Sequence, residues 1–599
     1  MKQSLWKHLS FSFWFGLFLL VSVFAFGQAS VKEVMDDVVT RMYATMSEEA
    51  LSNLDDQAIL NFITEEEREV FAGKYWYFDT NVPIIVSIIR NVDQAVVPFW
   101  LGETGFKKTD LVVKNSENWL YEVWQKAFDA GRVQLGINGF DQHTTPYFVG
   151  VGAQDPSADL RLTNFYPDNQ AGFDLREGAF IYHDWDELVL TEVPKELIGN
   201  RLLTTIRGRA FEAHLIRAFR ETPFPSSAEP DQVVLTWSED PRTTQTIQWR
   251  FNSTVTDGVI RYREKTTRSD VDFTEAPATY VLLEERFLMN DRYIHHFTGT
   301  LRNLKPGTTY VYFVGSPAKK QWSEEAEFTT APDGPAPFTF VLTSDSHNSD
   351  VWGSLLVKAF ERHPQTAFSM IAGDLVRTGH FRDHWDELFH YPRNIFNRRV
   401  VTPAIGNHDT QYGLGARLYL AMFGLPENGP EQIEKERTYS IEYGNAFFAF
   451  LDVTSPMEKQ TEWLEKQLAQ TKATWKFAVM HFPLFEIRSD YNEIHRESTQ
   501  LFDKYHTDFV LSGHTHYYLR THPMKNGKVV DSPAEGTVYL TTVSVPGRER
   551  RRGYPLPDFV AAAFGGDALY QTFDIDGNRL VMRTYNMNGD VRDELVIEK

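Results

Sequence analysis

The sequence predicts a multidomain α+β protein, in which a mixed, β-rich N-terminal domain and an antiparallel β-sandwich precede an α/β domain. Three observations indicate this order. The chain has 599 residues, too many for a single core. Two segments rich in Pro, Gly and Ser divide it, "TPFPSSAEP" at 222–230 and "APDGPAPF" at 331–338. The spacing of apolar residues then differs among the three parts.

The first 27 residues have the pattern of a signal peptide. Lys2 and Lys7 flank an apolar run at 11–26, and small residues precede Gln28. The alternative is an uncleaved membrane anchor, for which the run is short. We therefore expect an exported protein, periplasmic, extracellular or at the cell surface, with no stable membrane span after cleavage. The chain has no Cys, so its domains cannot depend on disulfides.

Residues 28–222 are expected to form a mixed domain of unassigned function. Helical spacing of apolar residues covers 31–72, and a further helix is expected at 207–221. Between them, short runs such as "PIIVSIIR" and "YFVGVG" are typical of strands. No motif in this region indicates chemistry.

The next two parts of the chain differ in their predicted secondary structure. Over 228–332, short strands such as "QVVLTWSE" and "TTYVYFVG" alternate with turn residues, which predicts an antiparallel sandwich of about 100 residues. Over 336–599, apolar strands alternate with helical stretches, which predicts an α/β domain completed by a β-rich tail.

Five predicted strands of the α/β domain end in side chains that bind metals. Asp345 and His347, two apart on an extended chain, are expected to share one face. Because α/β sites form outside the carboxyl ends of strands, we expect all five ends to meet in one crevice. Imidazole and carboxylate ligands suit Fe, Zn or Mn. The central carboxylate, Asp374, is the natural bridge between two ions. The candidate ligands are Asp345, His347, Asp374, Asn407, His481, His514 and His516.

Four further residues are candidates for roles around these ligands. His408 could donate a proton to a leaving group, and Asp409 could orient its imidazole from behind. Arg377 could contact a substrate phosphate or form a structural salt bridge. Arg548 begins the loop "RERRRG", which could face a phosphate or only solvent. The net charge of −21 argues against a nucleic-acid partner but permits a small phosphorylated substrate.

The motifs "SDSHN", "AGDLV", "GNHD", "VMHFP" and "SGHTH" resemble those of calcineurin-like metallophosphoesterases. The preceding "QVVLTWSEDPRTTQTIQWR" resembles the fibronectin type III-like N-terminal domain of purple acid phosphatases. The resemblance implies a four-layer α/β/β/α domain that hydrolyses phosphomonoesters by in-line attack of a metal-bridging hydroxide, with His408 as acid. It implies two metal sites that share Asp374. The first has Asp345, His347 and His516 as its other ligands, and the second has Asn407, His481 and His514.

Two departures from purple acid phosphatases concern the metals. That family has Gly at the position of His347 and a Tyr ligand at the position of Arg377. We therefore expect two divalent or mixed-valence ions of Fe, Zn or Mn, without a ferric–tyrosinate centre. Two alternatives remain open. The same ligands would serve a phosphodiesterase or nucleotide pyrophosphatase, and the β-rich domains would suit a surface adhesion or glycan-binding scaffold.

Overall fold

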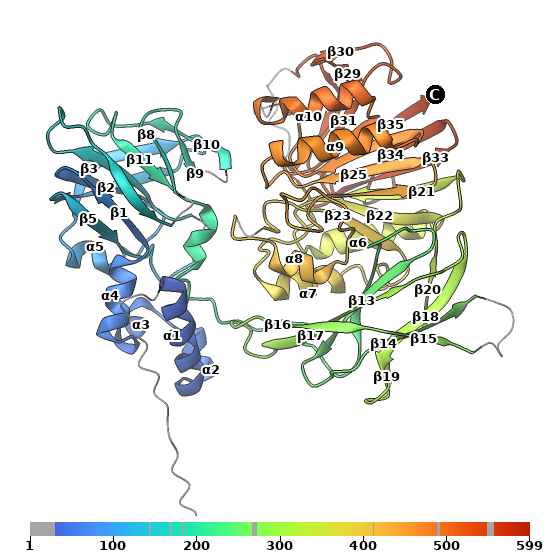
Figure 1. The fold of residues 1–599 in the computed structure, drawn as a ribbon, viewed down its shortest axis with the longest axis horizontal. Coiled ribbons are helices and arrows are strands. Elements are labelled where there is room, and N and C mark those ends of the chain that lie inside the picture. Colours follow the sequence, from blue (N-terminus) through green and yellow to red (C-terminus); the bar gives the residue numbers. More distant parts are fainter. Residues whose placement is uncertain are drawn as a thin grey trace, which may run out of the picture.

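The computed structural model describes residues 30–599 except 143–144, 168–169, 183–184, 266–271, 411–412, 488–491 and 548–555. The predicted signal peptide and Arg548 lie outside the described residues. Within the described part, no helix combines the length and apolar character needed to cross a membrane. Figure 1 shows the N-terminal domain in blue to teal beside the α/β domain in yellow to red, with the green sandwich below the α/β domain.

Four helices open the N-terminal domain, where the sequence predicts helix over 31–72. Each begins after a side chain that caps its first turn: Ser30, Ser47, Asp55 and Thr64. The helices are α1 (Val31–Thr45), α2 (Glu48–Ser52), α3 (Asp56–Phe62) and α4 (Glu65–Gly73), and α5 (Phe99–Glu103) follows later.

Two antiparallel sheets follow these helices. The larger runs in the order β8 (Ala171–Asp174), β11 (Arg201–Thr204), β6 (Phe148–Ala153), β2 (Ile84–Asn91), β4 (Leu120–Phe128), β3 (Lys107–Asn115), β10 (Trp185–Glu192), β9 (Phe180–Tyr182). The smaller has the order β5 (Gly131–Leu135), β1 (Trp76–Thr80), β7 (Leu162–Tyr166).

The helix predicted for 207–221 is wrong. Only a short 3₁₀ turn, η1 (Arg207–Phe211), forms there. The backbone N–H groups of Leu215 and Ile216 both donate to the carbonyl of Phe140, 2.9 Å away, instead of to the preceding turn. Arg217 then has a φ of 64°, which a right-handed helix does not allow. Tertiary hydrogen bonds therefore override the helical spacing of this segment.

The sandwich has two antiparallel sheets, as its alternating strands predict. One has the order β12 (Asp231–Thr236), β13 (Gln245–Asn252), β17 (Tyr293–Leu301), β16 (Thr279–Glu284). The other has the order β15 (Thr274–Pro277), β14 (Val259–Glu264), β18 (Thr309–Ser316), β19 (Gln321–Trp322), with β20 (Ala326–Thr329) also paired to β18.

The α/β domain contains two sheets packed face to face, and the predicted four-layer architecture is confirmed. The first runs β23 (Val400–Ala404), β22 (Thr366–Ala372), β21 (Phe338–Thr343), β33 (Leu569–Asp576), β34 (Arg579–Asn586), β35 (Val591–Glu598). The second runs β24 (Tyr439–Tyr443), β25 (Ala446–Leu451), β26 (Trp475–Met480), β27 (Phe509–Ser512), β31 (Val538–Thr541), β28 (Tyr518–Thr521), β32 (Val560–Phe564). Phe340 of the first sheet packs on Phe477 of the second, with ring centroids 5.5 Å apart.

Helices cover the outer faces of this pair of sheets (Figure 1). On the side of the first sheet lie α6 (Asp350–Arg362), α7 (Arg382–His390) and α8 (Arg417–Met422). On the second lie α9 (Glu458–Gln470) and α10 (Asn492–Tyr505), and a small hairpin joins β29 (Met524–Lys525) to β30 (Lys528–Val529). The parallel strands β21–β22–β23 and β25–β26–β27–β31 bring their carboxyl ends to one edge, where the predicted ligands follow them.

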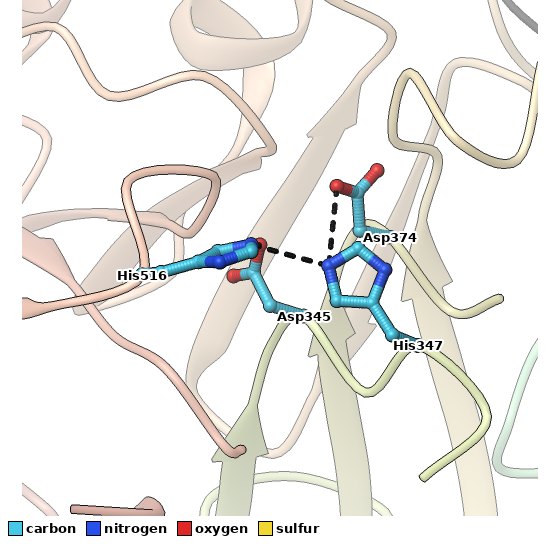
Figure 2. Close-up of side chains that lie close together, drawn as sticks. All are labelled: Asp345, His347, Asp374 and His516. Carbon is cyan, nitrogen blue, oxygen red and sulfur yellow. Dashed lines mark hydrogen bonds and ion pairs between the residues drawn. The ribbon is translucent and has the colours of Figure 1, made fainter. Parts of the chain in front are cut away.

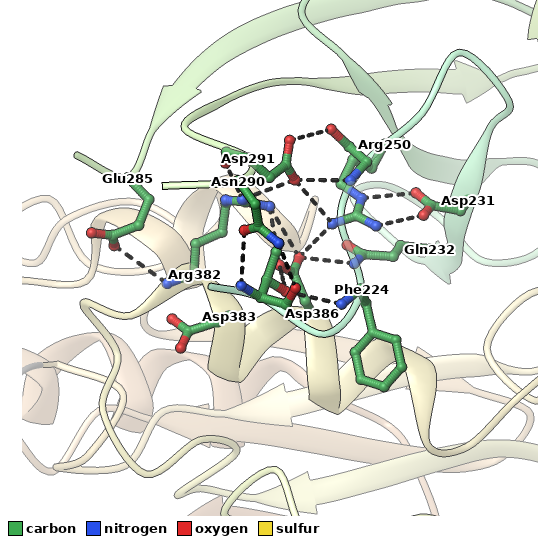
Figure 3. Close-up of polar contacts among 12 residues, drawn as sticks. Phe224, Asp231, Gln232, Arg250, Glu285, Asn290, Asp291, Arg382, Asp383 and Asp386 are labelled. Atoms are coloured by element: carbon green, nitrogen blue, oxygen red, sulfur yellow. Dashed lines mark hydrogen bonds and ion pairs between the residues drawn. The ribbon is translucent and has the colours of Figure 1, made fainter. Parts of the chain in front are cut away.

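The sandwich and the α/β domain share one hydrophobic core. Trp237 of the sandwich packs edge-on against Phe368 of β22, at a centroid distance of 5.2 Å. Beside this core, Arg250 of β13 reaches Asp386 of α7 in a buried network of charged side chains (Figure 3). The two domains are thus joined by packing and by buried ion pairs, in addition to the connecting segment 331–338.

Candidate dinuclear metal site

The loops after the strands turn through left-handed backbone conformations. The prediction that Asp345 and His347 share a face of an extended strand is wrong, because β21 ends at Thr343. Residues with a side chain rarely adopt positive φ, and such strain concentrates at functional sites. Five of the candidate ligands have it: Asp345 (50°), His347 (42°), Asp374 (51°), His514 (73°) and His516 (58°).

These turns bring four side chains from three separate loops together (Figure 2). Candidate ligand atoms of Asp345, His347, Asp374 and His516 all lie within 4.8 Å of one another. His347 Nε2 is 3.1 Å from His516 Nε2 and 3.8 Å from Asp374 Oδ2. His516 Nε2 is 3.2 Å from Asp345 Oδ1. Two imidazole nitrogens and two carboxylates therefore converge on one point.

A second group shares Asp374 with the first. Ligand atoms of Asp374, His481 and His514 also lie within 4.8 Å of one another. His481 Nε2 is 3.1 Å from Asp374 Oδ2, and its Nδ1 lies 2.8 Å from the carbonyl of Ala372. That carbonyl accepts a hydrogen bond from Nδ1–H, so Nε2 is the nitrogen that would bind a metal. Asp374 is thus the member common to both groups.

Asn407 supports the fit of this donor set to metal ions. Its Oδ1 is buried and has no hydrogen-bond partner among the described residues. An unpaired buried carbonyl oxygen costs free energy, and a cation would satisfy it. The donors are a mixture of imidazole nitrogen and oxygen, which suits Fe, Zn or Mn better than Mg or Ca. The residues therefore fit a pair of transition-metal ions.

The electrostatics of the site favour ionised carboxylates. Burial by itself raises the pKa of Asp374, but the charges of His481 and His408 hold it well below its usual value. Asp374 in turn raises the pKa of His481 to about 9, against the effect of burial. Burial lowers the pKa of His514 to about 3, so this imidazole is neutral and able to bind a metal.

His408 lies at the edge of both groups, with Nε2 3.9 Å from Asp374 Oδ2. Its Nδ1–H donates a hydrogen bond to the carbonyl of Arg377, 2.7 Å away. The prediction that Asp409 orients this imidazole is wrong. The carboxylate of Asp409 accepts hydrogen bonds from the backbone N–H groups of three residues: Leu375, Val376 and Gly406. Asp409 therefore connects the loop after β22 to the loop after β23. The carbonyl of Arg377, not Asp409, orients His408.

One residue that positions the backbone beside His408 was missed from the sequence. Asn348 accepts a hydrogen bond from the N–H of Arg377 over 2.9 Å, so it helps to place the carbonyl that holds His408. Arg377 itself is exposed, and burial raises the pKa of Glu387 even though the hydrogen bond from Asn348 and the charge of Arg377 act to lower it. Asn348 stands in the quoted motif "SDSHN", which was its only signal.

Glycines in the motifs permit close approach of the loops. A methyl group on Gly513 would overlap Ser344 Oγ and Asp345 Oδ2, and one on Gly406 would overlap the backbone of Asp374. Glycine is the residue that lets a backbone come so near its neighbours. The Gly in "SGHTH" and in "GNHD" is therefore explained by packing around the ligands.

Comparisons with known proteins agree with this geometry. The family model "Purple acid Phosphatase, N-terminal domain" matches residues 230–330, and "Calcineurin-like phosphoesterase" matches residues 338–518. An uncharacterised protein of Mycobacterium tuberculosis is 26% identical over 277 residues, which cover 39% of this chain and 52% of that protein. Fe(3+)-Zn(2+) purple acid phosphatase 12 of Arabidopsis thaliana is 26% identical over 260 residues, with 39% and 53% covered.

The chain spans about half the length of these two curated relatives. Among solved structures, the purple acid phosphatase PPD1 of yellow lupin (Lupinus luteus) has the same fold. It gives a TM-score of 0.54 at 16% identity, over 78% of this chain and 82% of that one. Residues 338–518 are thus a calcineurin-like phosphoesterase domain, and residues 230–330 before them are a purple acid phosphatase N-terminal domain.

Proposed function

We propose that this protein is an exported, dinuclear-metal phosphoesterase that hydrolyses phosphomonoesters. The observation that carries the proposal is the pair of ligand groups that share Asp374. Asp345, His347 and His516 would complete one metal site with it, and Asn407, His481 and His514 the other. When bound, two such ions neutralise a phosphoryl group and make water a nucleophile near neutral pH.

His408 is suited to protonate the leaving group. Its Nδ1 proton is held by the carbonyl of Arg377, so Nε2 is the nitrogen that faces Asp374 and the ligand groups. With the ring held in this orientation, a proton on Nε2 can pass to the departing oxygen. Arg377, exposed beside this imidazole, is proposed to attract the phosphate with its guanidinium.

Hydrolysis of p-nitrophenyl phosphate, compared with its bis-p-nitrophenyl diester, tests the substrate class. The purified protein, loaded in turn with Fe, Zn and Mn, is expected to prefer the monoester. A strong preference for the diester would favour the phosphodiesterase alternative. Metal below one ion per chain with no metal-dependent hydrolysis would favour the scaffold.

Export is proposed on the signal-peptide pattern of residues 1–27. N-terminal sequencing of protein recovered from the source organism is expected to begin at Gln28. Recovery of an intact first residue from a membrane fraction would contradict this.

A further inference from the structure

The N-terminal domain reaches the loops on both sides of His408. On one side, Phe211 of η1 packs against the rings of His380 and Phe381, at centroid distances of 5.6 Å and 6.3 Å. On the other side, a methyl on Gly413 would lie 3.0 Å from Ile206 Cγ2. The N-terminal domain thus borders the loops around the residue proposed as the acid.

Segment 377–381 forms two hydrogen bonds with His408. The carbonyl of Arg377 accepts from His408 Nδ1 over 2.7 Å, and the N–H of Gly379 donates to the carbonyl of His408 over 2.9 Å. Gly379 also lies so close to the carbonyl of Asp409 that a methyl group there would overlap it. A shift of this segment would therefore move the acceptor that sets the orientation of the imidazole.

The N-terminal domain also contacts Phe381, at the other end of segment 377–381. The guanidinium of Arg220 lies 3.9 Å from the ring centroid of Phe381. It also forms two hydrogen bonds with the carboxylate of Asp383, of 2.6 Å and 2.8 Å. Phe381 occupies the position before α7 and supplies no side-chain cap. The first turn of this helix is instead held by Arg220 through Asp383 and by Glu285, whose carboxylate accepts from the N–H of Arg382 over 3.4 Å.

We propose that the N-terminal domain positions His408, through the contacts of Phe211 and Arg220 with segment 377–383. The inference rests on the proposed function, because it assigns to this domain the alignment of the acid in that reaction. In this proposal, Phe211 and Arg220 act on the imidazole through segment 377–383 and the Arg377 carbonyl. General acid catalysis depends steeply on such alignment.

The test compares two substrates that differ in their need for an acid. Phenyl phosphate has a poor leaving group, and p-nitrophenyl phosphate a good one. For Phe211→Ala and Arg220→Gln, kcat is expected to fall about tenfold or more on phenyl phosphate and less than about threefold on p-nitrophenyl phosphate. Phe211→Tyr, which keeps the ring, is expected to retain activity on both.

A double mutant separates positioning from general damage. In a His408→Ala background, Phe211→Ala is expected to cause no further loss on phenyl phosphate, because the residue being positioned is gone. The matched control is Phe173→Ala, which removes a ring exposed on β8 of the same domain and is expected to change neither substrate's kcat. Equal losses on both substrates, additive losses in the double mutant, or loss of bound metal would overturn the inference.

Hydrogen exchange tests the inference without using activity. Backbone amides of 375–383 and 406–410 are expected to exchange about tenfold faster in Phe211→Ala than in wild type, and unchanged in Phe173→Ala. Unchanged exchange in Phe211→Ala would overturn the positioning role. A wild-type protein that binds two metals yet hydrolyses no phosphate ester would instead refute the proposed function.

Discussion

Replacing Asp386 with Leu removes the central carboxylate of the buried network that joins the sandwich to α7 (Figure 3). The side chain of Asp386 is fully buried and accepts hydrogen bonds from four residues. Arg250 Nη1 lies 2.7 Å away, Arg382 Nη1 at 3.1 Å and 3.2 Å, Gln232 Nε2 at 2.9 Å and Thr222 Oγ1 at 3.1 Å.

The expected loss of unfolding free energy depends on the partners that Arg250 and Arg382 keep after the change. Removing one partner of a buried ion pair destabilises a protein by about 3–5 kcal/mol. Arg250 keeps the carboxylate of Asp231 and Arg382 keeps that of Asp291, so we expect the lower end, about 3 kcal/mol. Burial raises the pKa of Asp386 despite its two guanidinium neighbours, which indicates a large desolvation cost for this charge. Arg250→Met combined with Asp386→Leu should therefore cost about 1–2 kcal/mol less than the sum of the single changes.

Urea unfolding followed by tryptophan fluorescence measures these values. Trp249 and Trp385 are buried on the two sides of this junction, in one continuous core, and should report one transition. Arg302→Met is the control, because the Arg302–Glu239 pair is exposed and should contribute less than about 1 kcal/mol. A loss below about 1 kcal/mol for Asp386→Leu, or strict additivity in the double mutant, would show that this network does not stabilise the junction.

Three further outcomes are expected. Burial lowers the pKa of His296 to about 4, so stability should fall by up to about 3 kcal/mol as the pH drops from 6.5 towards 4, since the unfolded chain binds the proton more readily. In His296→Leu, the urea midpoint should decrease less between pH 6.5 and pH 4 than it does in the wild type. An equal decrease in both proteins would contradict the role given to His296. Gly513→Ala places a methyl against Asp345 and should weaken metal retention on dialysis about tenfold or more, while Gly102→Ala, in open space, should not. Iron-loaded protein should lack the visible tyrosinate band, because Arg377 stands where that ligand would be, and a purple solution would contradict this.

The sequence predicted which strands would carry the candidate ligands, because ligand residue types follow apolar runs in a regular alternation. It could not predict how the ligands are presented. Asp345 and Asp374 have left-handed backbone conformations in loops that hydrogen-bond to each other, with the N–H of Asp345 donating to the carbonyl of Gly373 over 3.0 Å. No local spacing encodes such contacts. The role predicted for Asp409 was wrong for a similar reason: besides Gly406 of its own loop, it binds the backbone amides of Leu375 and Val376, which are distant in sequence.

Segment 207–221 shows a second limit of sequence reasoning. Its apolar spacing is helical, yet its backbone bonds to Phe140 and its side chains contact another domain. Because those partners lie outside the local window, the contact between the N-terminal domain and the loops beside His408 became visible only in three dimensions.

Anomalous X-ray diffraction from crystals of metal-loaded protein, collected on both sides of the Fe, Zn and Mn edges, would locate the metal ions. We expect two peaks about 3.5–4 Å apart, with the carboxylate of Asp374 between them. One peak should contact His347 and His516, and the other His481 and His514. A single peak, two peaks that do not share Asp374, or metal bound only elsewhere would contradict this expectation.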